Sequence, residues 1–542
     1  MGHADGPLAL PSTSYPQTTL GTCMELKAFA NVSLPKLAWV AEVDCANRIV
    51  RLVHGPSVEV RPDFFIEGVW SGPFEEGEFG DTDCVFGTGG ILGEDSIRFV
   101  PSASTVDSLY YKEQGPNVTV SNSLPLLLGY VGDALDPRCP EYPEICDSIM
   151  VGINHYRRDI PTKKGKVRRQ LYRNLDVSRE GVRESEKRMP PRFGCFEEYR
   201  EYLRDNYARI VANARDSART ETLEILSTQS TGYDTTAVNA IAGAYGIAKV
   251  FTVTKAKSVG RLAHQDEGHA PDDDGSDICK SLGLPCIPIN RRAFIEGFEE
   301  EQFLYCALYH NQDANLLEIG KYISKVSILL TGHGGAIWYP IASRAELLGE
   351  SRPDAELNST DSGGLGMAEL RLIVGFIHLP LPHIGARRKQ DIINITESSE
   401  MDSWRVGKAY DRPIARRIGE EGGVPRHLFG QYKKGSVVIF PQPAVPYGKA
   451  LRLEFFQYLA EEKLVARSTM VLWPFVHWVN AILMLKASRL YTAVHYIERI
   501  ISKLIGRRYR FKQMWSRFDG TLYCFCVNRA AKTYGERLAR TS

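Results

Sequence analysis

The sequence predicts an α/β protein built around a doubly wound parallel sheet, with a β-rich sandwich before it and helices after it. Three patterns support this fold class: short apolar runs separated by turn residues near the N-terminus, strand-like runs alternating with helical runs in the middle, and helical periodicity near the C-terminus. A chain of 542 residues is too long for one ordinary core, so we expect two or three domains. We divide it into a disordered lead-in (1–23), a β-rich domain (24–135), a connector (136–195), the α/β domain (196–450) and a helical extension (451–542).

The overall composition is that of an ordinary globular protein. The 66 Lys and Arg residues nearly balance the 65 Asp and Glu residues, which leaves a formal net charge of +1, and we expect no nucleic-acid partner. The 11 cysteines lack the paired C-x-x-C spacing of a zinc site, which favours reduced thiols in a cytoplasmic protein. The lead-in is rich in Gly, Pro, Ser and Thr and has no basic and apolar leader pattern.

Residues 24–135 have the pattern of packed antiparallel sheets. Short apolar runs at 38–41, 49–53 and 118–120 are separated by Gly, Pro, Asp and Asn. We interpret the glycine-rich run 87–90 as a turn, because no helical pattern follows it closely enough for a phosphate loop. The connector that comes next is marked by proline and charged residues.

From Phe196 onward, helical and strand-like patterns alternate. A first helix over 196–218 carries a single apolar stripe, and shorter strands and helices follow it. This alternation is typical of a parallel sheet with helices on both faces. The expected strands are 223–227, 249–254, 285–289 and 325–330, and the expected helices are 237–245 and 276–282.

The first of these strands is joined to the next helix by a loop of small, hydroxylated residues, Ser230-Thr231-Gly232-Tyr233-Asp234-Thr235-Thr236. Ligands of such sheets bind beyond the carboxyl ends of the strands, where backbone N–H groups and a helix N-terminus favour an anion such as phosphate. Asp234 would repel phosphate alone but suits a Mg²⁺ ion held against it. The alternative is an ordinary helix start with Asp or Thr as the N-cap.

The run 223–242 resembles the ATP-pyrophosphatase loop (PP-loop) of the asparagine synthetase-like family, which is written S-G-G-x-D-S. Thr231 stands in place of the middle Gly, and Thr235 stands in place of the last Ser. Other segments resemble family motifs in the same order along the chain. They are the strand ending at Thr254, the helix at 277–284, the second glycine motif at 332–335, the E-x-R at Glu369-Leu370-Arg371, and the C-terminal lysine region at 410–417 and 433–435.

The resemblance implies an ATP-dependent ligase that forms AMP and pyrophosphate while it joins a small-molecule or peptide carboxylate to an amine. In such an enzyme Asp234 would hold Mg²⁺, and Lys433, or its neighbour Lys434, would stabilise the transition state. Glu369 would orient or deprotonate the amine. The ATP contacts that the resemblance implies are Ser227, Ser230, Thr231, Gly232, Asp234, Thr235, Thr236, Thr254, Gly332, His333 and Gly334.

Two departures from the family pattern bear on activity. Residues 107–111 and 118–123 resemble the end of that family's glutaminase-like (Ntn) β-sandwich, but a working glutaminase begins with cysteine, and here Gly2 follows Met1 and the nearest cysteine is Cys23. The resemblance therefore implies a degenerate sandwich without glutaminase activity. In the second glycine motif, Ala336 replaces an acidic residue that would help to hold magnesium. The alternative function is a catalytically degenerate nucleotide-binding or scaffold protein.

The remaining polar candidates have no decisive spacing. We expect His333 to line the nucleotide pocket, whereas His378 and His383 lack metal-binding spacing and are interpreted as structural. The acidic run 272–274 is either a solvated loop that ends in a helix cap at Ser276 or a cation site.

Two segments leave alternatives open. The basic run 163–169 is either a solvated loop face or a contact for nucleic acid or acidic lipid. The apolar stretch 468–485 has about the minimum length of a membrane span but contains Pro474, so it is either a buried helix pair or a membrane-surface hairpin. Peripheral membrane contact through 468–512 stays open, as does the oligomeric state.

Overall fold

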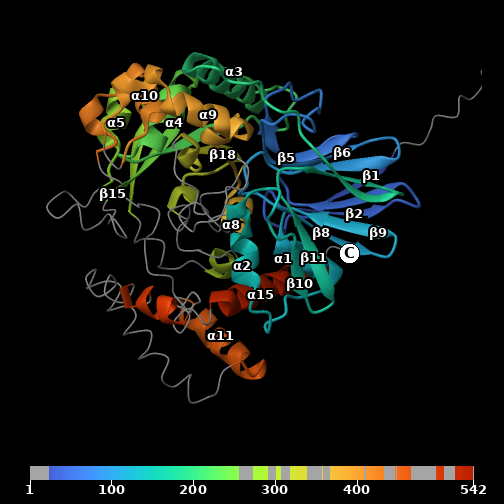
Figure 1. The fold of residues 1–542 in the computed structure, drawn as a ribbon. Coiled ribbons are helices and arrows are strands. Elements are labelled where there is room, and N and C mark those ends of the chain that lie inside the picture. The colour runs from blue at the N-terminus through green and yellow to red at the C-terminus, as the bar shows by residue number, and fades with distance from the viewer. Residues whose placement is uncertain are drawn as a thin grey trace, which may run out of the picture.

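The computed structural model describes residues 24–254, 273–290, 301–306, 318–338, 357, 367–407, 410–431, 446, 448–464, 496–497, 499–505 and 519–540. These residues form a mixed α/β protein with two β-rich sheets and one parallel sheet (Figure 1). The expected α/β class, with a β-rich region ahead of a parallel sheet, is confirmed.

The two β-rich sheets are built by the N-terminal part of the chain. The seven-stranded sheet has the order β1-β3-β2-β9-β8-β11-β10, and the six-stranded sheet has the order β13-β12-β7-β6-β5-β4. Neighbouring strands are antiparallel, apart from the parallel pair β1 and β3. The strands are β1 Glu25–Ala30, β2 Trp39–Asp44, β3 Ile49–His54, β4 Glu59–Val60, β5 Phe64–Trp70, β6 Val85–Leu92, β7 Ser96–Val100, β8 Leu109–Gln114, β9 Asn117–Ser121, β10 Asp159–Thr162, β11 Gly165–Gln170, β12 Asn174–Ser178 and β13 Gly181–Ser185.

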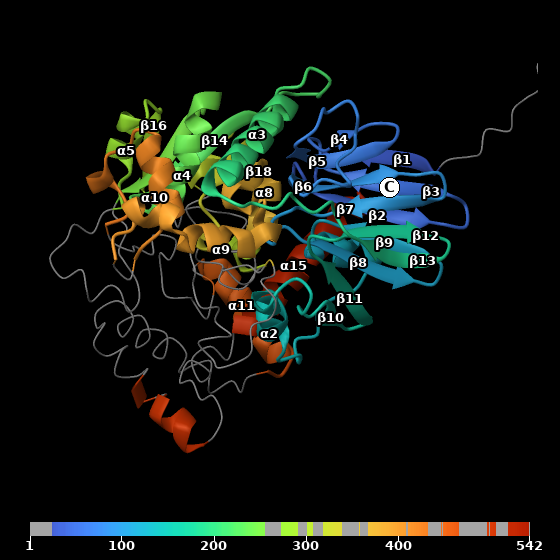
Figure 2. The same cartoon turned by 45° about the horizontal axis from the view of Figure 1, so that its top comes forward.

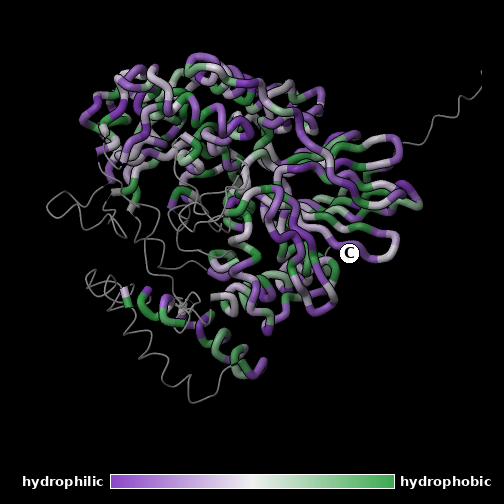
Figure 3. The backbone as a smooth tube through the Cα atoms, viewed as in Figure 1, coloured by the Kyte–Doolittle hydropathy of each residue, from purple (hydrophilic) through white to green (hydrophobic). Residues whose placement is uncertain are grey.

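These two sheets pack face to face around Trp39. Its ring stacks on Phe99 with 5.9 Å between centroids and meets Phe65 edge-on at 5.0 Å, so side chains from both sheets share one core. The buried indole N–H donates to Oγ1 of Thr88 at 3.1 Å. Hydrophobic and hydrophilic residues alternate along the strands, as expected for sheets with one buried face (Figure 3).

The interpretation of 87–90 as a turn is wrong, because these residues lie inside β6. Gly87 has φ +96°, and a Cβ built on it would collide with the backbone of Glu67 in β5. Glycine is therefore required where the two strands approach closely. A run of glycines is typical both of a turn and of a place where two paired strands approach closely, so the sequence alone does not distinguish them.

The sheets also continue beyond residue 135, because β10 to β13 lie within the expected connector and reach Ser185. Most of the basic run 163–169 lies in the hairpin of β10 and β11 at the edge of the seven-stranded sheet. There Lys166 contacts Asp159 at 2.6 Å, and Arg168 contacts Glu113 at 2.9 Å. These pairings support the interpretation of the run as a solvated face.

The α/β domain contains a five-stranded parallel sheet of order β16-β15-β14-β17-β18. Figure 2 shows its helices packed around the sheet. The sequence did not predict β18, in which His378 interrupts a short apolar run. The strands are β14 Glu224–Gln229, β15 Lys249–Thr254, β16 Cys286–Asn290, β17 Ser327–Thr331 and β18 Phe376–Pro380, and the helices are α3 Phe196–Ala214, α4 Tyr233–Ala242, α5 Ser276–Ser281, α8 Met367–Val374, α9 Lys389–Glu397 and α10 Pro413–Glu421.

The helix α15 (Asp519–Ala539) packs against α1 (Leu124–Val131), which follows strand β9 of the sandwich. A Cβ built on Gly129 of α1 would collide with the carbonyl oxygen of Ala531, so the two helices touch backbone to backbone. Tyr534 on α15 is fully buried. This helix of the expected extension 451–542 is thus part of the core between the two domains.

No helix within the described ranges is long and apolar enough to cross a membrane. The apolar stretch 468–485 and the lead-in 1–23 lie outside the described residues. Of the segment 468–512, the structure describes 496–497 and 499–505, where Ile497 and Leu504 are 46% and 80% exposed.

Candidate functional site

Two glycine-containing turns meet at the carboxyl edge of the parallel sheet. One turn (230–232) follows β14 and the other (332–335) follows β17, and these two strands are direct neighbours. The strand order reverses between them, since β15 and β16 lie on one side of β14 while β17 and β18 lie on the other. Open α/β sheets bind ligands at such a switch point.

Helix α4 begins at Tyr233, immediately after the first turn and four residues before the start that the sequence predicts. Gly232 precedes it in an extended conformation, with φ −79° and ψ 170°. Asp234 therefore lies in the first helical turn, where the backbone N–H groups and the helix dipole create a positive potential.

The second turn closes directly over Asp234. A Cβ built on Gly332 would lie 2.9 Å from Cβ of Asp234, and one built on Gly335 would collide with the carboxyl group. Side chains at these two glycines would therefore push the turns apart. The structure brings together Asp234 and the glycine motif that follows β17, which are about a hundred residues apart in sequence.

The carboxyl group of Asp234 is only partly matched by protein groups. Its Oδ1 is buried and accepts no hydrogen bond within the described residues. Nε of Arg412, just before α10, lies 3.9 Å from it, which is an ion-pair distance. A buried carboxylate oxygen without a hydrogen-bond donor is a suitable ligand for a hard cation such as Mg²⁺.

The hydroxyl groups of the first turn bond mainly to the turn itself. The backbone N–H of Ser230 donates to Oγ1 of Thr235 at 3.0 Å, and the N–H of Gly232 donates to Oγ of Ser230 at 3.1 Å. The hydroxyl of Thr236 donates to the carbonyl of Gly232 at 2.8 Å. Ser227 is fully buried and donates to Oδ1 of Asn239 at 2.6 Å, so its hydroxyl serves the contact between β14 and α4.

Asp273, which lies far along the chain, makes an unexpected contact with the first turn. Its Oδ1 accepts the backbone N–H of Thr231 at 2.9 Å and the Thr231 hydroxyl at 2.6 Å, and Asp273 itself is buried. The sequence suggested only that the acidic run 272–274 is solvated or binds a cation. A carboxylate thus occupies donors that a phosphate group would use, so phosphate binding at Thr231 requires Asp273 to move.

Tyr410 and Arg416, from the segment that resembles the family's C-terminal lysine region, pack against the start of α4. The ring of Tyr233 lies 4.8 Å from that of Tyr410 and 5.8 Å from that of Phe429. Arg416 donates to the Tyr233 hydroxyl, and its guanidinium lies 4.9 Å from the ring centroid. This aromatic and cationic packing fixes the start of α4.

Three histidines lie beside the second turn. His333 is in the turn, His378 is in β18, and His383 is in the short 3-10 helix η9 (Leu381–His383) that follows β18. The ring of His333 is 5.7 Å from that of His383 and 5.8 Å from that of His378. Sequence spacing gave no sign of this cluster, because it depends on the pairing of β17 with β18.

The other predicted site residues do not meet at these turns. Thr254 is the last residue of β15, at the same edge of the sheet, and Lys433 lies outside the described residues. Glu369 is buried and accepts a hydrogen bond from the Tyr534 hydroxyl at 3.2 Å. Burial raises the pKa of Glu369 to about 7. Among the described contacts, none joins Glu369 to either turn.

Arg371, two residues further along α8, joins the α/β domain to the sandwich. Its Nη1 and Nη2 donate to Glu67 at 2.7 and 2.9 Å, and its Nε donates to Asp107 at 2.6 Å. All three side chains are buried. We call this group the Arg371 cluster.

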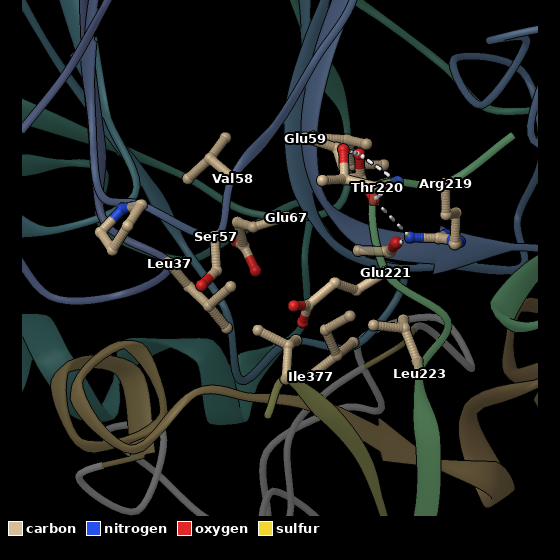
Figure 4. Close-up of a pocket in the computed structure, with 14 residues that line it drawn as sticks. Leu37, Ser57, Val58, Glu59, Glu67, Arg219, Thr220, Glu221, Leu223 and Ile377 are labelled. Carbon is tan, nitrogen blue, oxygen red and sulfur yellow. Dashed lines mark hydrogen bonds and ion pairs between the residues drawn. The ribbon is translucent and has the colours of Figure 1, made fainter. Parts of the chain in front are cut away.

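A cavity of about 140 Å³ lies between the domains (Figure 4). Its walls include Glu67 and Leu37 from the sandwich and Arg219 and Ile377 from the α/β side. Drug-sized ligands and cofactors occupy pockets of about 300 Å³ or more, so this cavity is too small for a nucleotide. The turns at the switch point remain the better candidate.

Neither a protein-family model nor a curated protein matches this sequence. Among solved structures, a U34-tRNA thiolase from Methanococcus maripaludis with its 4Fe-4S cluster is similar at 10% identity, with a TM-score of 0.18, over 42% of this chain and 72% of the thiolase. Glutamine phosphoribosylpyrophosphate amidotransferase from B. subtilis, complexed with ADP and GMP, is similar at 12% identity, with a TM-score of 0.13, over 65% of this chain and 67% of the other. TM-scores this low carry no functional argument.

Proposed function

We propose that this chain is an ATP-dependent amide ligase of the asparagine synthetase-like type. A carboxylate oxygen of a small molecule or peptide attacks the α-phosphorus of ATP, and the bond from that phosphorus to the oxygen of pyrophosphate breaks. An amine then attacks the acyl carbon, loses a proton and displaces AMP. The sandwich serves as a scaffold without glutaminase activity.

The position of Asp234 carries this proposal. Its carboxyl group lies at the switch point of a parallel sheet, in the first turn of a helix and under a glycine turn from the neighbouring strand. An acid at the N-cap position commonly caps a helix, but here the N-cap is Gly232, Asp234 lies inside the first turn, and its Oδ1 accepts no hydrogen bond within the described residues. A metal-bound nucleotide accounts for an acid in this place.

The residues of the site fit Mg²⁺ and ATP. Asp234 would hold the metal, which supplies positive charge to the departing pyrophosphate. The positive N-terminus of α4 and the guanidinium of Arg412 would attract phosphate oxygens. The N–H groups of the first turn donate to Thr235, Asp273 and Ser230 in this structure, so they would bind phosphate only after these acceptors move. We keep Lys433 as the stabiliser of the transition state. A pKa of about 7 suits Glu369 as the acceptor of the amine proton, but Glu369 lies with Tyr534 in the domain junction, so this role requires the amine to reach that junction.

Exchange of labelled pyrophosphate into ATP, measured with pools of carboxylates, tests adenylation without knowledge of the amine. We expect exchange with at least one pool, and its loss in Asp234→Ala. Asp274→Ala, at an exposed acid nearby, is the matched control and should retain exchange. Binding of ATP without exchange in any pool would contradict the ligase proposal.

A nucleotide-binding or scaffold protein without catalysis is the second candidate. It is favoured by Asp273, whose carboxylate takes both donors of Thr231. It is also favoured by Ala336, which offers no second acid for a metal. This candidate predicts that the wild-type chain and Asp273→Asn both lack exchange, whether or not they bind ATP.

A further inference from the structure

We infer that His333, His378 and His383 form an imidazole cluster that binds the β- and γ-phosphates of the nucleotide and then the pyrophosphate product. This inference rests on the proposed function, because it assigns a ligand group to a second part of the same site. It adds His378 and His383, whose sequence positions suggested only structural roles.

The three rings form one compact group at the carboxyl edge of the sheet. The rings of His333 and His383 are parallel within 2°, at 5.7 Å between centroids. His378 meets His333 at 63°, with 5.8 Å between centroids. Three different segments supply these side chains, so the grouping is a product of the fold and not of a local sequence motif.

The second turn links this cluster to Asp234. A Cβ built on Gly334, which has φ +78°, would collide with the imidazole of His383, while one built on Gly335 would collide with the carboxyl group of Asp234. Two adjacent glycines thus let the turn fit between the acid and the imidazoles. A phosphate chain whose metal is held by Asp234 has the cluster beside it.

The innermost ring has a nitrogen available for further bonding. His378 is fully buried, and its Nε2 lies 2.7 Å from Oγ1 of Thr331. Its Nδ1 is buried and has no hydrogen-bond partner within the described residues. Burial lowers the pKa of His378, so its ring is neutral and provides an N–H donor or a nitrogen acceptor at neutral pH. A buried polar nitrogen is normally bonded, and a ligand oxygen or water is the missing partner.

An anion suits this cluster better than a metal ion. The described residues contain no group of three His, Cys, Asp or Glu side chains placed to hold a metal. Two parallel stacked rings do not direct their nitrogens to one point, as a coordinated metal requires. Imidazole N–H groups are suitable donors to phosphate oxygens, and Arg412, with its Nε 3.9 Å from Oδ1 of Asp234, adds positive charge.

The test compares three probes by calorimetric titration: a non-hydrolysable ATP analogue with Mg²⁺, inorganic pyrophosphate with Mg²⁺, and AMP. The variants are His333→Ala, His333→Gln and His383→Asn, with His427→Ala at an exposed histidine as the matched control. Because His333 is only half-buried, its variants should fold, which a thermal unfolding curve would check. Loss of a hydrogen bond to a charged group predicts about 10- to 100-fold weaker binding of the ATP analogue and of pyrophosphate to His333→Ala.

For His333→Ala we expect this weakening for the ATP analogue and pyrophosphate, and a change of less than about twofold for AMP. We expect partial recovery of binding in His333→Gln and no change in His427→Ala. Unchanged binding of both probes by a folded His333→Ala, together with their loss in Asp234→Ala, would overturn the cluster and leave the proposed function standing. Equal weakening of AMP would also overturn it. No binding of the ATP analogue by the wild-type chain would overturn the proposed function, and the cluster with it.

Discussion

Two polar regions of this protein differ in how closely arginine pairs with their acids. In the Arg371 cluster, all three guanidinium nitrogens donate to carboxylates at 2.6 to 2.9 Å, and the group ties the sandwich to the α/β domain. At the switch point, Asp234 has a guanidinium nitrogen at 3.9 Å and a buried oxygen without a hydrogen bond within the described residues. Both regions combine acids with arginine, and each has one buried carboxylate oxygen without a hydrogen bond within the described residues, Oδ2 of Asp107 in the cluster and Oδ1 of Asp234 at the switch point. Only in the cluster does the arginine donate hydrogen bonds directly to its acids.

This difference separates a structural role from a binding role. Buried charges that are hydrogen-bonded to each other hold two surfaces in one geometry, and removing one of them leaves an uncompensated charge. A partly buried acid whose nearest cation is beyond hydrogen-bond distance is retained where a ligand completes its bonding. The comparison predicts loss of stability from changes in the Arg371 cluster and loss of binding from changes at Asp234.

The largest effect is expected for Arg371→Ala. It leaves the carboxylates of Glu67 and Asp107 buried without their counter-charge, so we expect a loss of about 3–5 kcal/mol in the free energy of unfolding, measured with urea. Arg183→Ala is the control, because its pair with Glu180 is exposed on both sides, and it should cost less than about 1 kcal/mol. A loss of similar size in both variants would remove the contrast between the two regions.

The next effect concerns Glu369, which lies near the Arg371 cluster and has a pKa of about 7 in place of the ordinary 4.5. The folded protein holds this proton more tightly than the unfolded chain, so stability is fully present below pH 4.5 and is lost as pH rises to about 7. Glu369→Gln has no such titration, and its stability relative to the wild type should rise by about 3 kcal/mol between these pH values. The free energy of unfolding is measured with urea at each pH. The same pH dependence in the two proteins would show that Glu369 is not buried as described.

A smaller loss is expected for Gly129→Ala, where α1 meets α15. The added Cβ collides with the backbone of Ala531, so we expect about 1–3 kcal/mol of destabilisation from overpacking, measured by thermal unfolding. Gly115→Ala meets no atom nearby but has φ +62°, so its cost comes from the backbone alone and should be smaller. An unchanged Gly129→Ala protein would mean that α15 is not part of the domain junction.

The smallest effect is expected at the first turn. Asp273→Asn removes a negative charge beside the donors of Thr231, so binding of a Mg²⁺-bound ATP analogue should strengthen about fivefold, which corresponds to about 1 kcal/mol. Asp274→Asn, at an exposed acid next in the chain, should change binding by less than about twofold. Loss of Mg²⁺-dependent binding in Asp273→Asn would instead make Asp273 a ligand of the metal.

Much of the α/β domain was predictable from periodicity, because its strands are short apolar runs with helical patterns between them. The expected strand 249–254 has the observed bounds of β15, whereas β18 was missed because His378 lies inside it. The prediction of a turn at Gly87 was wrong, because glycine is favoured both in turns and where two paired strands approach closely. Likewise, nothing local in 519–539 shows that this helix fills the domain junction.

The sequence predicted the local motifs of the candidate site but not the tertiary contacts that bring other residues to it. The sequence places Asp234 after a strand, and the parallel pairing of β14 with β17 then brings Gly332 to it. Asp273 and His383 reach the site through contacts that depend on tertiary packing, which no spacing encodes. Glu369 follows a motif in sequence yet lies with Tyr534, because α8 packs into the domain junction.

The most direct test of the central proposal is calorimetric titration of the wild-type protein and Asp234→Ala with a non-hydrolysable ATP analogue and Mg²⁺. We predict micromolar binding that depends on Mg²⁺ in the wild type, a loss of at least about tenfold in affinity in the variant, and similar unfolding curves for both proteins. Equal affinity in the two proteins, or no binding by the wild type, would contradict the assignment of a nucleotide site to the two glycine turns.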